Sequence, residues 1–428
     1  MKLKRVNATP LFLLSLVFPG VGFLFSLKRI WDKQYHKIIL LFFFWFGYSI
    51  MFFGGDIQEY KDAFPITANY TWNDFFYLLS HVFSDDKWTN YQYSIVISKP
   101  DIYSFALQFI VSRFTDELRW FFAFASVIYA YIFLQFINEV LRISGIRDSK
   151  PWKIFFASLL LIVPFYVGVS GIRFWPALFL FLLFVLKYFR TKKFVNIAIA
   201  AVSVLFHYSF IIPIAVLLVF TVVRNSKIFL RVIVVFTIIF FAVSTTTGLF
   251  GFANEAIGIF GENSISEVAG SYTDEEAVNE HNEGNVAVNW YVTARQVLMT
   301  YSFMSIFLLD FFGVFKWRTS KYLDSWFPLY VLFFCISMLT YNLGSIGRFM
   351  YVFQLLCVIR LLILSSINYK NKALNIIANL LLPVIIIHAL LSFRSGFYFV
   401  DPLLFVGNPI VFFLVHSTTS LSELLVGH

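Results

Sequence analysis

Two polar residues, Arg173 and His207, lie beside long apolar runs and are of types that can do chemistry. Asp56, Arg295 and Arg348 also stand at or near the ends of apolar runs. A guanidinium binds the oxygens of a diphosphate or an anionic glycan bidentately. A histidine or a carboxylate beside it can take a proton from a sugar hydroxyl near neutral pH. These residue types therefore indicate a site for an anionic, phosphate-bearing substrate.

Each of these residues also has a structural interpretation. Arg173 and Arg348 could extend their side chains to the membrane surface from the ends of spans. His207 could pack while bonded to a backbone carbonyl, and Asp56 could cap a helix. Arg295 could pair with an acidic residue of a loop. A charge within a membrane span costs roughly 2.5–3.5 kcal/mol, which favours a functional role for the set.

The composition indicates a membrane protein. Of 428 residues, 59% are hydrophobic, 21% aromatic and only 13% charged, about half the charged fraction of a soluble domain. Apolar runs of roughly 15–20 residues recur along the chain, as in α-helical proteins with many spans. The short alternating segments of a β-barrel are absent from the sequence. We expect one all-α polytopic domain over residues 1–428, with about 11–14 transmembrane or re-entrant helices.

The net charge of +9 reflects topology and not nucleic-acid binding, because the basic residues lie in short loops between apolar runs. No phosphate-binding, zinc-protease or dinucleotide motif is present, and Cys335 and Cys357 lie within apolar runs. We therefore expect neither a metal nor a cofactor. The positive-inside rule places these basic residues in the cytoplasm: Arg142, Arg147, Lys150, Lys153, Arg190, Lys192, Lys193, Arg224, Lys227, Arg231, Lys316, Arg318, Lys321, Lys370 and Lys372.

This topology brings Arg173 and His207 to the same outer level. Residues 174–189 return to the cytoplasm, and 195–223 are too short for two full spans, so they predict a broken hairpin with His207 near its turn. Residues 54–100 should form an outer segment, followed by a half-helix over 101–112. The acidic stretch 248–290 should be a long outer loop over the site. Residues 11–27, with Pro19-Gly20, form either a re-entrant hairpin or a single span.

Five short motifs in this order resemble the EpsG family, which is related to Wzy-type polysaccharide polymerases. The most specific part is the spacing between Gly171-Ile172-Arg173 and Phe206-His207-Tyr208-Ser209. The other parts are Gly55-Asp56-Ile57-Gln58-Glu59-Tyr60, Lys99-Pro100-Asp101-Ile102-Tyr103 and Gly347-Arg348-Phe349-Met350-Tyr351. Where the family often has glutamine after the arginine, this chain has Phe174-Trp175-Pro176, so no role for that glutamine is carried over.

The resemblance implies polymerisation of undecaprenyl-diphosphate-linked repeat units for O-antigen, capsule or exopolysaccharide. It implies a GT-C-like membrane glycosyltransferase without cofactor or metal, in the bacterial cytoplasmic membrane with its active site facing outward. His207 and Asp56 become the candidate catalytic residues. Arg173, Arg348, Arg295 and Tyr60 become the candidate residues for the diphosphate or glycan. The expected partners are the lipid-linked glycans, membrane lipid and a chain-length regulator protein, with no nucleic acid.

Two other functions stay open. A transporter or flippase for lipid-linked glycans would favour inverted repeats and charges near the midplane, and the sequence has neither. A membrane acyltransferase that modifies surface sugars would need its donor site toward the cytoplasm, whereas His207 is expected to face outward. The sequence does not decide whether His207 or Asp56 is the base.

Overall fold

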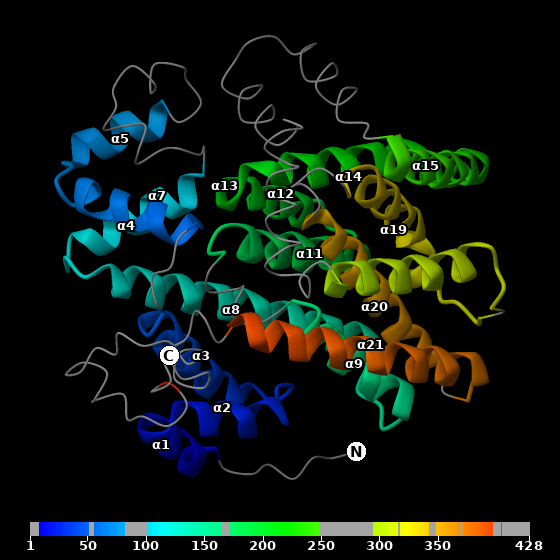
Figure 1. Ribbon diagram of the computed structural model, residues 1–428, viewed down its shortest axis with the longest axis horizontal. Coiled ribbons are helices and arrows are strands. Elements are labelled where there is room, and N and C mark those ends of the chain that lie inside the picture. The colour runs from blue at the N-terminus through cyan, green and yellow to red at the C-terminus, as the bar shows by residue number, and fades with distance from the viewer. Residues whose placement is uncertain are drawn as a thin grey trace.

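The computed structural model describes residues 8–50, 55–81, 101–163, 171–247, 294–315, 317–341, 348–368, 370–396 and 404. Within these ranges the fold is helical and contains no β-strand (Figure 1). The first half comprises α1 (Thr9–Val17), α2 (Pro19–Leu27), α3 (Lys33–Tyr48), α4 (Gly55–Ala68), α5 (Trp72–Ser80), α7 (Ile102–Ser112), α8 (Leu118–Ser144) and α9 (Lys150–Leu161).

The second half begins with α11 (Phe174–Thr191) and the short helices α12 (Val195–Ala201) and α13 (Ser203–Phe206). A 3-10 turn, Tyr208–Phe210, leads into α14 (Ile211–Val223) and α15 (Lys227–Thr247). A helix over residues 294–311 follows. The bundle is completed by α19 (Lys321–Leu339), α20 (Met350–Ile367) and α21 (Lys372–Gly396).

Five helices of the described ranges are long and apolar enough to cross a membrane. They are Leu118–Ser144, Phe174–Thr191, Lys321–Leu339, Met350–Ile367 and Lys372–Arg394, and shorter apolar helices accompany them. The chain is thus a multi-pass all-α membrane protein, which confirms the predicted fold class. The count of 11–14 helices and the likeness to GT-C enzymes stay predictions.

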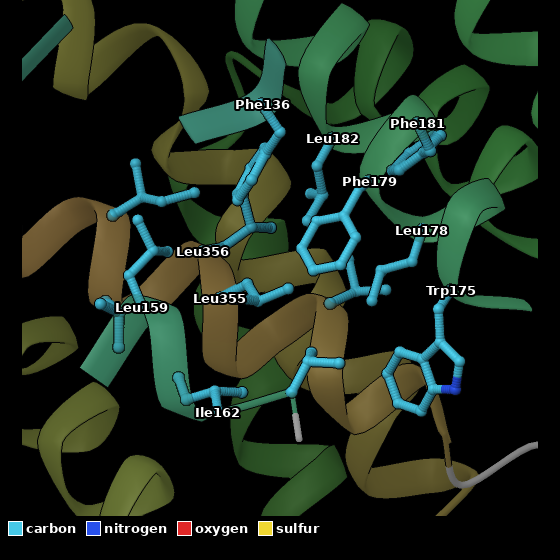
Figure 2. Packing of buried hydrophobic residues seen from close by; sticks show 14 of the residues in the cluster. Phe136, Leu159, Ile162, Trp175, Leu178, Phe179, Phe181, Leu182, Leu355 and Leu356 are labelled. Atoms are coloured by element: carbon cyan, nitrogen blue, oxygen red, sulfur yellow. The ribbon is translucent and has the colours of Figure 1, made fainter. Parts of the chain in front are cut away.

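The core lies where α8, α9, α11 and α20 meet. Figure 2 shows Phe136 of α8 and Leu159 of α9 directed toward Phe179 of α11 and Leu355 of α20. All four side chains are buried. By contrast, α14, α15 and α21 expose large apolar residues such as Val222 and Leu380, which is the pattern of helices that face lipid. The central helices are therefore fixed by packing on several sides.

Small residues allow two close helix contacts. Gly47 of α3 lies against α8, where an added Cβ would collide with the backbone oxygen of Phe122 and the hydroxyl of Ser126. In α2, a Cβ on Gly22 would collide with Ser15 of α1. Residues 11–27 therefore form a tight helical hairpin that is broken at Phe18. This agrees with the predicted hairpin. The alternative, a single span, does not fit, because α1 is too short.

A small layer formed by α4, α5 and α7 lies beside one end of the long helices (Figure 1). Its own core contains Ala63, Phe75, Leu78, Phe105 and Phe109. The layer covers part of the predicted outer segment 54–100 and includes the predicted half-helix, which is α7. Residues 82–100 and the predicted acidic loop 248–290 lie outside the described ranges.

Arg113 connects the end of α7 to the C-terminal end of α4. Its guanidinium donates to the carbonyl oxygens of Tyr70 at 2.8 Å, Thr67 at 3.1 Å and Ala68 at 2.6 Å. The last carbonyls of a helix have no partner within it, so a cation that binds them stabilises the helix end. Arg113 thereby ties the end of α7 to α4.

Replacing Arg113 with methionine should loosen α4. The variant loses three hydrogen bonds to exposed or half-buried carbonyls, and we expect the local free energy of opening to fall by about 1–2 kcal/mol. Hydrogen–deuterium exchange of residues 55–68 measures this change. Arg231→Met in α15 removes an exposed arginine elsewhere and should leave the same peptide unchanged. Equal exchange in both variants would show that Arg113 does not hold α4.

Candidate functional site

A buried ion pair joins α7 to the start of α11. One guanidinium nitrogen of Arg173 donates to a carboxylate oxygen of Asp101 at 2.9 Å. The two side chains are only 6% and 3% exposed. Arg173 directly precedes α11, so the pair sits at the positive end of an 18-residue helix. The interpretation of Arg173 as an arginine that simply reaches the membrane surface is therefore wrong.

Asp101 also fixes the position of the segment that carries His207. Its second carboxylate oxygen accepts the backbone N–H of Tyr208 at 2.7 Å. Asp101 occupies the N-cap position of α7, yet its side chain does not cap that helix. The stacking of Tyr103 on Phe206, with ring centroids 4.3 Å apart, adds a second contact between the same segments. One carboxylate thus joins three segments that are far apart in the sequence.

His207 lies at the break between α13 and the 3-10 turn, with extended backbone angles of φ −151° and ψ 116°. The chain runs through α12 and α13 to this break and returns through α14, which contacts α12. The predicted broken hairpin with His207 at its turn is confirmed. Residues 195–223 can form this hairpin, although they are too short for two full spans, because neither of its arms is a full span.

The ring of His207 is held in one orientation. Its Nδ1 accepts the backbone N–H of Ser209 at 3.3 Å and lies 2.8 Å from the hydroxyl of the same serine. A backbone N–H can only donate, so Nδ1 carries no proton and the neutral ring carries its proton on Nε2. In this tautomer Nε2 is a hydrogen-bond donor. The geometry thus favours a donating role for His207 over a role as a base.

Phe174 is the centre around which these groups gather. Its ring lies 5.5 Å from the ring of His207, and the guanidinium carbon of Arg348 lies 5.9 Å from its centroid. It also contacts Phe210 and Phe349. Arg348 is half-buried. An aromatic face attracts a cation at this distance and leaves its N–H groups available for an anion. Phe174, which stands where the resemblance would have glutamine, is therefore the residue that contacts both Arg348 and His207.

Tyr60 joins the same group from α4. It is buried, and the guanidinium carbon of Arg173 lies 5.7 Å from its ring centroid. Asp56 lies in α4 one turn before Tyr60, and its side chain is outside the described residues. The structure thus brings together Arg173, His207, Arg348 and Tyr60 of the predicted site residues, and it places the backbone of Asp56 on the neighbouring turn of α4.

Arg295 has different neighbours. It is buried at the start of the helix over residues 294–311 and donates to the hydroxyl of Ser392 in α21 at 3.0 Å. His388, one turn earlier in α21, donates from Nε2 to the carbonyl oxygen of Ile162 at 2.9 Å. The contacts described for Arg295 are thus with α21 and not with α11. Its predicted pairing with an acidic residue of a loop falls on the stretch 248–290, outside the described ranges.

Asp101 is a residue of the site that is not among the candidates predicted from the sequence. It lies in the Lys99-Pro100-Asp101-Ile102-Tyr103 motif, at the start of the predicted half-helix. One signal was available: an acidic side chain directly before an 11-residue apolar helix needs a cation when it is buried. Which cation it meets depends on a contact 72 residues along the chain, and the local sequence does not contain that information.

The described residues contain no group of three or more histidine, cysteine, aspartate or glutamate side chains that could hold a metal ion. The arginines of the site can bind anionic oxygen, and His207 can donate a hydrogen bond. We name the set Arg173, Asp101, His207, Phe174 and Arg348 the arginine–histidine cluster.

Comparison with protein families identifies a family for this chain. The model of the EpsG family matches residues 34–401, which include every member of the arginine–histidine cluster. Comparisons with curated proteins and with solved structures gave no match. The matched region covers most of the chain and includes all five candidate spans in full. The chain therefore belongs to the EpsG family, whose members are membrane proteins linked to polysaccharide biosynthesis.

Proposed function

We propose that the protein polymerises lipid-diphosphate-linked oligosaccharide repeat units at the end of the bundle where the arginine–histidine cluster lies. The acceptor hydroxyl forms a bond to the anomeric carbon of the donor glycan, and the bond from that carbon to the lipid diphosphate breaks. The proton of the hydroxyl passes to a base. The lipid diphosphate leaves with both bonding electrons, and its negative charge must be stabilised.

The observation that supports this proposal is that Arg348 and His207 both contact Phe174, while Asp101 joins Arg173 to the backbone beside His207. Arg348 contributes a half-buried guanidinium that stacks on an aromatic ring and can bind a phosphate oxygen. Arg173 contributes a second guanidinium, whose orientation is fixed by Asp101. The start of α11 adds the partial positive charge of a helix N-terminus.

His207 is proposed as a hydrogen-bond donor to the leaving phosphate through Nε2, because its Nδ1 is engaged by the Ser209 N–H. The base is then proposed to be Asp56, on the turn of α4 next to Tyr60. Its carboxylate would accept the proton of the acceptor hydroxyl. In this proposal His207 donates a hydrogen bond, whereas Asp56 accepts a proton.

The test of this function uses purified protein, reconstituted in vesicles with a lipid-linked repeat unit. A polymerase produces a ladder of glycans that differ by one repeat unit. A flippase moves unchanged substrate across the vesicle, and an acyltransferase adds the mass of an acyl group without lengthening the glycan. A ladder without added metal supports the proposal, and either of the other two products would contradict it.

Arg348 should contribute charge and geometry to this reaction. Arg348→Ala removes a charge-assisted contact to the diphosphate, and we expect the rate of chain growth to fall about 100-fold or more. Arg348→Lys should recover only part of that loss, because an ammonium cannot form the two parallel bonds of a guanidinium. Arg394→Ala, at the end of α21, serves as the comparison. The assignment is wrong if Arg348→Ala keeps the normal rate.

A further inference from the structure

A cavity of about 670 Å³ lies at the opposite ends of the same helices, away from the arginine–histidine cluster. It opens among the last turns of α8, α11 and α20 and the first turn of α19. Arg142 lies in the last turn of α8, Arg190 lies in the last turn of α11, and Arg147 follows α8. None of these residues belongs to the arginine–histidine cluster.

Two of the three arginines in the cavity have no countercharge within the described part of the chain. Arg190 is neutralised by Glu139, with which it forms bonds of 2.5 and 3.3 Å. Arg142 and Arg147 are exposed and form no ion pair or hydrogen bond with any residue that the structure describes. The cavity therefore carries an excess of positive charge that an anion would balance.

The surroundings reinforce this positive charge. Ser320 is the N-cap of α19, so the positive end of a 19-residue helix borders the cavity. At the end of α11, the pKa of Lys192 lies below its ordinary value, first because of partial burial and then because Arg224 and Lys321 carry like charges nearby. Basic groups are thus concentrated at this end of the bundle.

The lining also suits a ligand with both a polar and an apolar part. Ser144, Ser320, Ser366 and Tyr322 present hydroxyl groups. Ile143, Ile363 and Ile367 present aliphatic surface. A soluble phosphate compound would need only the first kind of group, whereas a phospholipid needs both.

We propose that this cavity binds a phosphate group, and that the phosphate is the headgroup of an anionic phospholipid. Arg142 and Arg147 bind the phosphate oxygens, the hydroxyl groups contact the glycerol part, and the isoleucines contact the start of the acyl chains. The basic loops assign this end of the bundle to the cytoplasmic leaflet by the positive-inside rule. The site is separate from the proposed polymerase site and does not depend on it.

The test is native mass spectrometry of the full-length protein in a neutral detergent, titrated with phosphatidylglycerol or phosphatidylcholine. We expect at least about tenfold tighter binding of phosphatidylglycerol. The double variant Arg142→Gln with Arg147→Gln should lose about tenfold or more of that affinity, since each lost charge-assisted bond contributes strongly. The matched variant Lys227→Gln with Arg231→Gln loses the same charge outside the cavity and should bind like the original protein.

Three results would overturn the proposal. Equal losses in the two double variants would show that only net charge matters, and equal affinity for the two lipids would show that the cavity does not select anionic headgroups. Glycerol phosphate provides the third comparison. If it binds as tightly as phosphatidylglycerol, the lipid source is wrong and the occupant is a soluble phosphate compound. Thermal unfolding of both variants verifies that they are folded, which is expected because all four side chains are exposed.

Discussion

Asp101→Ala is expected to abolish chain growth and to destabilise the protein. The substitution leaves the guanidinium of Arg173 buried without its carboxylate partner, and it removes the acceptor of the Tyr208 N–H. Breaking a buried ion pair by removing one partner costs about 3–5 kcal/mol. The segment that carries His207 then loses its fixed position, and we expect activity to fall at least about 100-fold. Thermal unfolding and the ladder assay measure the two effects.

A matched control separates loss of stability from loss of the site. Asp310 forms a comparable buried pair with Arg360, at a distance of 2.5 Å, near the C-terminal end of the helix over residues 294–311. Asp310→Ala should destabilise the protein to a similar extent but keep normal activity per folded molecule. Asp101→Asn should be intermediate, because an amide oxygen still accepts the Tyr208 N–H. If Asp101→Ala is folded and fully active, the ion pair does not organise the site.

The second large effect concerns the proton on His207. His207→Ala removes the proposed donor to the leaving phosphate, and removal of such a donor typically costs about 10²–10³-fold in rate. Glutamine keeps an N–H group but cannot take a proton at neutral pH. His207→Gln should therefore stay within about tenfold of the normal rate. The full dependence of the rate on pH should be measured for both variants.

The shape of the pH dependence distinguishes a donor role from a base role of His207, whatever the size of the loss in rate. If His207 only donates, the fall in rate at acidic pH that reports the base persists in His207→Gln. If His207 is the base, that limb disappears and His207→Gln is as slow as His207→Ala. Ser209→Ala serves as the control, because the backbone N–H of residue 209 still binds Nδ1. Its effect should be less than about tenfold.

The prediction of helices from this sequence succeeded where apolar length decides the structure. The span predicted over residues 174–189 corresponds to α11, and the half-helix predicted over 101–112 corresponds to α7. The broken helix around His207 was also predicted, because 29 residues between basic loops cannot form two full spans. In both cases the information is local: length, basic flanks and proline or glycine positions fix the element.

The pairing of side chains could not be predicted in the same way. The residues of the site are separated by tens to hundreds of positions in the sequence. They are Tyr60 in α4, Asp101 at the start of α7, Arg173 at the start of α11, His207 at the break before α14, and Arg348 at the start of α20. A topology that places several residues at one level of the membrane does not say which of them are neighbours around the bundle. Arg295 illustrates this, because it meets Ser392 of α21.

The sequence by itself determined that the chain is an all-helical membrane protein, where its helices break and which polar residues lie at helix ends, because hydrophobic length and basic flanks are properties of contiguous residues. Only the tertiary structure decided that Asp101 holds both Arg173 and the backbone beside His207, and that Ser209 leaves the proton of His207 on Nε2. Those features depend on how α7, α11 and α14 pack, and packing is set by the shapes of side chains that are distant in the sequence.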